Sequence, residues 1–308
     1  MIISCGESLI DMLPRTSEQG ESMFAPVVGG AVFNTAKALG RLGEASGYFC
    51  CLSNDAFGEM LCSALEEANV SYELCPRSDL PTALALVSLN NGSASYSFHF
   101  SDTAGFSLKQ EDLPIFPEDV KGLHFGGISL IAEPCGAAYE ALLLRECQQR
   151  LISIDPNIRP GSITDEAVYR KRIEGMLAQS HIIKVSDEDL EWLCPGQEVE
   201  QAVQPWLNAN ALLVVVTRGE HGASVFTRNF TSTVPAVPAV VVDTVGAGDT
   251  FVAGLWAGLR AEGLIDKETL VGAEQAAVER AVAYAQQAAS ISVSRAGADS
   301  PWLHEMPK

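Results

Sequence analysis

A short run of acids and glycines near the C-terminal end of the chain has the residue types of an anion-binding site. The segment "VVVDTVGAGDTF" spans residues 240–251. An apolar run followed by a glycine pair and an amphipathic segment is typical of a strand that leads into a helix start. The small residues Gly246, Ala247 and Gly248 would let an anion approach the backbone, where free N–H groups can stabilise its charge. The segment therefore predicts an anion hole, with Asp249 beside it.

The carboxylate of Asp249 needs an explanation of its own, because it would repel a bound anion. One explanation is structural, since an acid in the first turn of a helix interacts favourably with the helix dipole. The other is a general base that takes a proton from an attacking hydroxyl group. The residue types alone leave both explanations open.

Two common phosphate-binding motifs are absent from this region. A Walker loop requires a lysine directly after its last glycine, and no lysine occurs between Lys184 and Lys267. A dinucleotide-binding fingerprint requires a glycine where this chain has Phe251. A nicotinamide-dependent oxidoreductase therefore has little support.

A second glycine pair lies near the N-terminus, in "GGAVFNTA". Gly29 and Gly30 open a predicted helix, and Asn34 lies one turn inside it. These residues either pack a loop-to-helix transition or offer backbone and amide contacts to a polyol. Asp11, just after the first predicted strand, is a candidate acceptor for two hydroxyl groups of a sugar.

The elements that position these residues follow an alternating pattern. Short apolar runs alternate with amphipathic segments, which predicts an α/β fold with a doubly wound, mostly parallel sheet flanked by helices. The expected strands are 2–5, 47–52, 122–126, 151–154, 182–185 and 212–217, and the expected helices are 31–42, 57–68, 137–149, 166–177, 250–263 and 268–289.

Two regions interrupt this alternation with additional strand patterns. We expect segments 9–28 and 71–103 to form a small antiparallel sheet that projects from a single domain spanning residues 1–308. Such a sheet would act as a lid over a cleft or as a subunit contact, and a neutral surface hairpin is the alternative. Its expected strands are 9–12, 23–28, 72–74, 83–89 and 94–100, with Asn90-Asn91-Gly92 as a hairpin turn.

Composition narrows the class of protein. The 308 residues are 47% hydrophobic and carry a net charge of −19, which disfavours nucleic acid or an anionic membrane as a partner. The N-terminus lacks a basic start, no apolar run has the length of a membrane span, and the eight cysteines show no C-x-x-C spacing. We therefore expect a cytoplasmic protein with reduced thiols.

Together, the two glycine motifs resemble a known family. "GGAVFNTAKALGRLG" (29–43) and "DTVGAGDTFVAGL" (243–255) are similar to the two signatures of ribokinase-like sugar kinases, also called the phosphofructokinase-B type family. The likeness extends from "GESLID" to "SRAGA", over essentially the whole chain. The resemblance implies a ribokinase-like fold and transfer of the γ-phosphate of ATP to a sugar hydroxyl.

The resemblance also implies a role for each matching position. It makes Asp249 the base that deprotonates the sugar hydroxyl, and it makes residues 246–248 the anion hole. Magnesium is expected with ATP, and potassium as an activator. The implied sugar-contacting residues are Asp11, Gly29, Gly30 and Asn34, the nucleotide-binding residues are Ser186, Thr217, Gly219 and Gly222, and the monovalent-cation loop contains Asp243, Val245, Ser292, Arg295 and Gly297.

One position departs from the family pattern. Many members carry N-x-x-E where this chain has Ser186 and, three residues later, Asp189, both with shorter side chains. The resemblance implies that Asp189 contacts magnesium through water. The alternative is a helix cap, because this spacing is close to a capping box; both can coexist.

The sugar is the least specified part of this prediction. "IDPNIRP" (154–160) resembles a segment of the fructokinase and 2-keto-3-deoxygluconate kinase branches, in which Arg159 reaches substrate or nucleotide; a surface ion pair is the alternative. The keto-acid kinases place a tyrosine and an arginine in the lid to hold the sugar carboxylate. Here Tyr96 and Phe98 occupy the matching strand, and no arginine occurs within 78–144. A neutral sugar, with fructose first, is therefore expected, and Phe98 packs over it or in the lid core.

Other functions remain open at this stage. Within the family, they are a ribokinase, a nucleoside kinase or the keto-acid kinase. Outside it, the alternative is a non-catalytic sugar sensor, which retention of Asp249 and the anion hole disfavours. A homodimer through the lid is a further expectation, since the apolar strand 83–89 is either an interface or part of the lid core.

Overall fold

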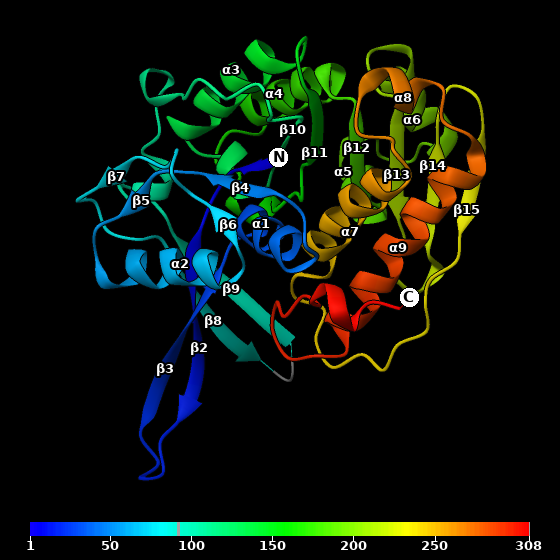
Figure 1. The fold of residues 1–308 in the computed structure, drawn as a ribbon. Helices are drawn as coiled ribbons and strands as arrows, with labels where there is room; N and C mark the ends of the chain where they lie inside the picture. The colour runs from blue at the N-terminus through cyan, green and yellow to red at the C-terminus, as the bar shows by residue number, and fades with distance from the viewer. Residues whose placement is uncertain (91–92, 308) are drawn as a thin grey trace.

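A nine-stranded sheet forms the centre of the described molecule (Figure 1). The computed structural model describes residues 1–90 and 93–307, without the side chains of residues 89, 90 and 93–96. The strands of this sheet are β1 (Ile2–Cys5), β4 (Ser46–Phe49), β6 (Val70–Ser71), β10 (Gly122–Gly126), β11 (Leu151–Asp155), β12 (Ile182–Ser186), β13 (Leu213–Thr217), β14 (Ala223–Phe226) and β15 (Thr231–Val234). Their order is β15-β14-β13-β12-β11-β10-β1-β4-β6, and only the β13–β14 and β14–β15 pairs are antiparallel. The expected mostly parallel sheet is confirmed.

Helices cover both faces of this sheet, which is why its central strands are buried at every position. In β1, Ile2 and its neighbour Ile3 pack in different hydrophobic clusters, under α1 (Ala31–Arg41), α7 (Ala247–Ala261) and α9 (Gln275–Val293) and under α3 (Cys135–Glu146), α4 (Glu166–Gln179) and α6 (Val199–Asn208) respectively. The helices are α1 (Ala31–Arg41), α2 (Ala56–Glu67), α3 (Cys135–Glu146), α4 (Glu166–Gln179), α5 (Asp187–Leu193), α6 (Val199–Asn208), α7 (Ala247–Ala261), α8 (Lys267–Val271) and α9 (Gln275–Val293). Within the described chain, none of them is long and apolar enough to cross a bilayer.

Three expected elements differ from the structure. The single helix expected at 268–289 is α8 followed by α9, because α8 ends at the Gly272 cap and α9 restarts after Glu274. The expected strand 72–74 is a turn, in which the Cys75 N–H donates to the Tyr72 carbonyl oxygen (3.0 Å). The expected strand 47–52 ends early as β4, and its end forms β5 (Leu52–Ser53), which pairs with β7 (Arg77–Ser78).

The small sheet is present, with one pairing that differs from the expectation. Its order is β3-β2-β8-β9, formed by β2 (Leu9–Thr16), β3 (Ser22–Gly29), β8 (Leu84–Asn90) and β9 (Ser93–His99). The pairs β2–β3 and β8–β9 are antiparallel hairpins, but β2 and β8 are parallel. The wholly antiparallel sheet is therefore wrong at the seam where the two hairpins meet. Of the turn expected at Asn90-Asn91-Gly92, Asn90 is the last residue of β8, and residues 91 and 92 lie outside the described residues.

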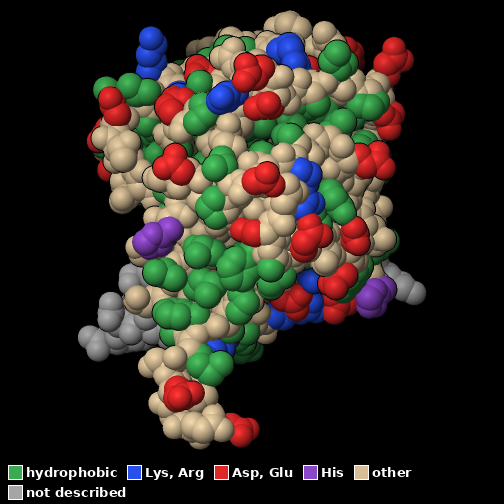
Figure 2. Space-filling view, turned by 90° about the vertical axis from the view of Figure 1, so that its left-hand side faces the viewer, with side chains coloured by type: hydrophobic (Ala, Val, Ile, Leu, Met, Phe, Trp, Pro, Cys, Tyr) green, Lys and Arg blue, Asp and Glu red, His purple; other side chains and the backbone are tan. Residues whose placement is uncertain are grey.

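The β2–β3 hairpin projects from the body of the protein, and hydrophobic side chains gather above its tip on the face shown in Figure 2. Met23 and Phe24 on β3 are each 50% exposed, and Met60 on α2 is 36% exposed. Large apolar side chains in water are normal singly, but a cluster of them marks an interaction surface. The described part of the chain leaves this side of the small sheet uncovered.

We predict that the contact between β10 and α7 tolerates no added methyl group. A Cβ at Gly122 would lie 2.3 Å from the Trp256 ring, which is 1% exposed and has no room to move. Gly122→Ala should therefore lower the free energy of unfolding by about 1–3 kcal/mol in urea denaturation. Gly175, exposed on α4, is the matched control, and Gly175→Ala should raise that free energy by about 0.5–1 kcal/mol. Wild-type stability in Gly122→Ala would contradict this packing.

Candidate active site

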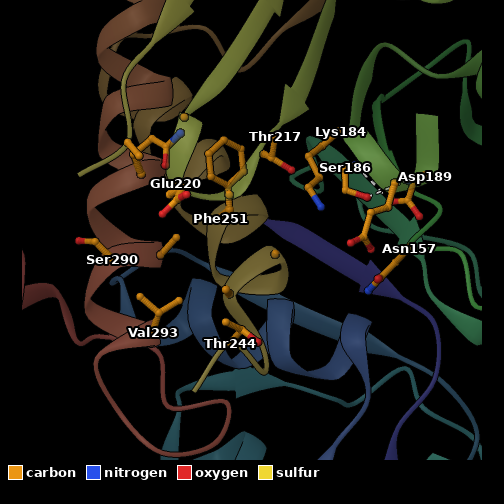
Figure 3. Close-up of a pocket in the computed structure, with 18 of the residues that line it drawn as sticks. Asn157, Lys184, Ser186, Asp189, Thr217, Glu220, Thr244, Phe251, Ser290 and Val293 are labelled. Carbon is orange, nitrogen blue, oxygen red and sulfur yellow. Dashed lines mark hydrogen bonds between the residues drawn. The ribbon is translucent and has the colours of Figure 1, made fainter. Parts of the chain in front are cut away.

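Two cavities meet at the start of α7. The first has a volume of about 790 Å³ and lies among the carboxyl ends of β12 and β13, α7 and α9 (Figure 3). The second has a volume of about 630 Å³ and lies between the small sheet, the start of α1 and the segment 241–249. The residues that line both are Asn157, Arg159, Val241, Thr244 and Gly248. A ligand in one cavity can therefore reach a ligand in the other at the first turn of α7.

The first turn of α7 begins in a conformation that requires glycine. Gly246 is the N-cap, with φ 74°, and a Cβ there would lie 2.6 Å from the Ala298 side chain. Ala247, Gly248 and Asp249 are the first residues of the helix. The Ala247 N–H donates to the Thr244 carbonyl oxygen (3.2 Å), whereas the N–H groups of Gly248 and Asp249 lie where a helix lacks its own acceptors. The predicted anion hole therefore lies at the junction of the two cavities.

Asp249 is buried at this junction, with 7% of its surface exposed. The Asn34 amide nitrogen donates to its Oδ2 (2.9 Å), and the Thr35 hydroxyl donates to its carbonyl oxygen (3.3 Å), so α1 holds the start of α7 in place. Burial raises the pKa of Asp249 to about 7, since it outweighs the opposing hydrogen bond from Asn34, and the Asp155 carboxylate adds to the rise. A carboxyl group with this pKa can exchange a proton near neutral pH.

The second cavity is lined by Asp11, Gly30 and Asn34, three of the residues expected to contact a sugar, but not by Gly29. Burial raises the pKa of Asp11 to about 6, and a Cβ at Gly29 would lie 2.3 Å from its Oδ2, so only glycine leaves room for this carboxylate. Gly30 has φ 108°, with the Glu7 backbone against it. The Asn34 Oδ1 is buried and accepts no hydrogen bond from the described residues, which leaves it available to a ligand hydroxyl.

The small sheet supplies one wall of this second cavity. Phe98 of β9 lines it and also packs against the main core, and its contact with a sugar stays a prediction. Phe100 instead stacks on Phe106, with ring centroids 4.8 Å apart. Tyr96 lies opposite Val87 in the β8–β9 pair, and its side chain lies outside the described residues.

The residues expected to bind a nucleotide line the first cavity. Ser186 and Thr217 lie at the ends of adjacent parallel strands, and Gly219 and Gly222 form the turn that follows (Figure 3). Gly222 has φ 84°, and a Cβ there would lie 2.3 Å from the Val234 carbonyl oxygen. The opposite wall is mostly apolar (Figure 3): residues 236–239 with Val241, Phe251, Ala289 and Val293 form it, and Gln286 and Ser290 are its polar members.

Ser186 and Asp189 form a reciprocal capping box at the start of α5. The Ser186 Oγ accepts from the Asp189 N–H (3.0 Å), and the Asp189 Oδ2 accepts from the Ser186 N–H (3.2 Å). The Asp189 Oδ1 also accepts from the Ile158 N–H (2.8 Å). The capping interpretation is therefore present in the structure, and the magnesium contact of Asp189 stays a prediction.

The Asp243 carboxylate joins the two loops expected to hold a monovalent cation. Its Oδ1 accepts from the Val245 N–H (3.0 Å), and its Oδ2 accepts from the Gly297 N–H (2.9 Å). Ser292 is fully buried below this loop, while the Arg295 guanidinium turns away to Glu305. Both contacts of this carboxylate are with backbone N–H donors, and the monovalent-cation site stays a prediction. Across residues 1–90 and 93–307, no group of three or more His, Cys, Asp or Glu side chains has the arrangement of a metal site.

The valine run before this loop is not a strand. Val240, Val241 and Val242 are 82%, 62% and 60% exposed, and they follow the last strand of the sheet as an irregular segment. The Val242 and Asp243 N–H groups both donate to the Val293 carbonyl oxygen, which holds the segment over the cavities. The prediction of a strand before this helix is therefore wrong, whereas the helix begins where it was expected.

Arg159 makes no ion pair within the described part of the chain. It is exposed, lines both cavities, and its guanidinium donates to the Asn157 and Ile158 carbonyl oxygens (3.2 and 3.1 Å). The surface ion-pair alternative is wrong in this structure. The side chain is instead a cation at the junction of the cavities.

Sequence reasoning missed a buried ion pair beside the anion hole. The Lys184 Nζ donates to the Asp155 Oδ2 (2.7 Å), and both residues are less than 10% exposed. Burial lowers the pKa of Lys184, but the carboxylates of Asp155, Asp189 and Asp249 raise it more, so the ammonium is held charged. The sequence feature that could have revealed this pair is the lysine inside the apolar strand "IIKVS", because a buried charge is unfavourable unless it is paired.

Comparison with known proteins gives consistent matches. The profile of the pfkB family carbohydrate kinases matches residues 1–305. A fructokinase of Rhizobium leguminosarum bv. trifolii is 48% identical over 278 residues, which cover 90% of this chain and 85% of the relative. The crystal structure of a fructokinase with bound ATP from Xylella fastidiosa superposes with a TM-score of 0.88 at 26% identity, covering 99% of this chain and 94% of that one.

A second solved structure carries more ligands. A fructokinase double mutant from Vibrio cholerae O395, in fructose-, ADP- and potassium-bound form, has a TM-score of 0.83 at 25% identity. The match covers 96% of this chain and 93% of the Vibrio chain. The fold described above is therefore shared over nearly its whole length.

We predict that Asp249 lowers stability at neutral pH. Because its folded pKa is about 7, above the ordinary 3.8, the folded state holds the proton more tightly than the unfolded state. The stability that this group contributes is present at low pH and is lost as the pH rises through about 7. Asp249→Asn should therefore raise the melting temperature at pH 8, and the gain should shrink towards pH 4. Asp102→Asn, an exposed site at φ 55° that Asn also adopts, should show no such gain; an equal change in both variants would contradict the prediction.

Proposed function

Since the chain belongs to the pfkB family of carbohydrate kinases, we propose that it is a fructokinase that uses Asp249 as its general base. It is an ATP-dependent sugar kinase by family and by its 48% identical fructokinase relative. The finer assignment of sugar and base is ours. The observation that carries it is the burial of Asp249, with a pKa raised to about 7, where the two cavities meet.

The two cavities divide between the two substrates in this proposal. ATP occupies the cavity of about 790 Å³, with its base against the apolar wall around Phe251 and its phosphates towards Gly248. The sugar occupies the cavity of about 630 Å³, where Asp11 and Asn34 bind its hydroxyl groups. The Xylella fructokinase structure contains ATP, and the Vibrio structure contains fructose and ADP, which supports this division.

The reaction then needs one proton acceptor and one anion hole. A sugar hydroxyl oxygen attacks the γ-phosphorus and forms the new P–O bond, while the bond from that phosphorus to the β–γ bridging oxygen breaks and ADP leaves with its electron pair. Asp249 takes the hydroxyl proton, and Asn34 holds the carboxylate in position. The backbone N–H group of Gly248, a residue that lines both cavities, stabilises the charge on the transferring group.

The charge of the sugar cavity favours a neutral substrate. Of the described residues that line it, Glu7, Asp11, Asp243 and Asp249 are acidic, and Arg159 is the basic one. The carboxylate of a keto-acid sugar would be repelled by this surface. This supports fructose over 2-keto-3-deoxygluconate.

Two ions belong to this proposal. Magnesium bound with the ATP phosphates would neutralise their charge, since Mg²⁺ prefers phosphate, water and one or two carboxylates. Potassium would be held by Asp243 and the carbonyl oxygens around Val245 and residues 292–297, where it would order the loop before the anion hole. The carboxylate that already joins these two loops supports the potassium assignment.

The remaining proposals concern the small sheet. We infer that it is a lid, formed from residues 9–28 and 71–103, on a single kinase domain spanning 1–308. Its exposed side chains Met23 and Phe24 would lie in a homodimer interface. The dimer and a cytoplasmic location stay predictions.

A substrate panel tests the proposed function. With ATP and magnesium, we expect kcat/KM for fructose to exceed that for ribose, adenosine and 2-keto-3-deoxygluconate by at least about 100-fold. The acidic cavity disfavours the keto acid, and the lid restricts the shape of the neutral substrates. The measurement is a coupled ADP-release assay, run with and without potassium. Phosphorylation of the keto acid alone would contradict the proposal.

The variant Asp249→Asn tests the assignment of the base, because it keeps the size of the side chain and an oxygen that can accept from Asn34. It should lower kcat by several orders of magnitude if the carboxylate is the base. No turnover by the wild-type protein on any sugar would instead favour the non-catalytic sugar sensor.

A further inference from the structure

A buried ammonium group lies against the anion hole. Lys184 is on β12, is 6% exposed and lines the cavity assigned above to ATP. A Cβ built on Gly248 would lie 3.2 Å from its Nζ, so this nitrogen lies beside the first turn of α7. Figure 3 shows Lys184 on the same side of the cavity as Ser186, Asp189 and Asn157. The ammonium therefore faces the place where the two cavities join.

One carboxylate holds this ammonium and leaves most of its hydrogen-bonding capacity unused. The Lys184 Nζ donates to the Asp155 Oδ2 (2.7 Å), while the Asp155 Oδ1 accepts from the Asn157 N–H (3.2 Å). A lysine ammonium has three N–H donors. Within the described residues, Asp155 is the one acceptor that Lys184 uses, so two donors remain on an ammonium that lines the cavity.

A purely structural role explains this ion pair poorly. Lys184 lies between Ile183 and Val185 in a strand that is apolar except for Lys184 and the terminal Ser186. A buried ion pair can usually be replaced by apolar residues without loss of stability, so it adds little to folding. A buried charge pair that lines the cavity and adds little to folding indicates a ligand-binding purpose.

We propose that the Lys184 ammonium contacts the terminal phosphoryl group of ATP and makes the site distinguish the triphosphate from the diphosphate. The inference rests on the proposed kinase function, because the γ-phosphate must lie at the junction for transfer to the sugar. The chain has no Walker lysine, and Lys184 supplies the same charge from the strand instead of the loop. Asp155 is a positioning residue that orients the ammonium.

The position of Lys184 along the nucleotide sets its specificity. The apolar wall of residues 236–239 and Phe251 lies at the base end of the cavity, and Gly248 lies at the transfer end. A cation beside Gly248 therefore contacts the γ-phosphate, and other groups bind the α- and β-phosphates. As the γ-phosphoryl group moves to the sugar, its charge stays within reach of the same ammonium.

Binding measurements without sugar test this inference. Dissociation constants for ADP and for a non-hydrolysable ATP analogue are measured by calorimetry, with magnesium, on the wild type and on Lys184→Met. We expect the analogue to bind about 10- to 100-fold more weakly to the variant, because a charge-assisted contact is lost. ADP binding should change by less than about threefold, because this contact is made to the γ-phosphate. Lys267→Met makes the same change at a partly buried lysine that does not line the ATP cavity, and should bind both nucleotides as the wild type does.

A second variant distinguishes loss of the phosphate contact from misfolding. Lys184→Met leaves Asp155 buried without its partner, so the double variant Asp155→Asn/Lys184→Met removes both charges and should fold with the same nucleotide preference as the single variant. Equal weakening of both ligands, or no weakening in either folded variant, would overturn the inference. Failure of the wild type to bind either nucleotide would instead overturn the proposed kinase function.

Discussion

The structure depends on one buried carboxylate at a helix start. Asp249 lies where α7 begins, and burial raises its pKa to about 7 despite the hydrogen bond from Asn34. That hydrogen bond joins α1 to α7, so the glycine motif of each helix is held against the other. The two cavities meet next to this contact, at Gly248, which supports the proposal that a substrate in one reacts with a substrate in the other.

The charges around this carboxylate divide the junction into two sides. Asp11 and Asp249 make the sugar side acidic, which suits hydroxyl donors and a base. On the proposed nucleotide side, Lys184 and the start of α7 provide local positive groups next to Gly248, although Glu188, Asp189 and Glu220 also line this cavity. The acidic composition that disfavours nucleic acid is thus compatible with a phosphate site, because the opposing charges are local and buried.

The sequence predicted the parts whose signal is local. The glycine pairs placed both helix starts, and apolar runs such as 122–126 matched the parallel strands of the core. Prediction from the sequence was wrong where strand pairing depends on residues far apart in the chain, as in the parallel β2–β8 pair. It was also wrong at residues 240–242, a β-branched run that borders a cavity instead of joining a sheet. The Lys184–Asp155 pair was missed because its partners are 29 residues apart and meet only across neighbouring strands.

The most direct test of this account is the titration of Asp249 itself. Carboxyl carbon NMR of the folded protein, with Asp249→Asn to assign the signal, reports its protonation as the pH changes. The account predicts a midpoint near pH 7, because burial disfavours the charged form. A midpoint near the ordinary pKa of 3.8 would show a hydrated carboxylate and would contradict the account of a buried base between the two cavities.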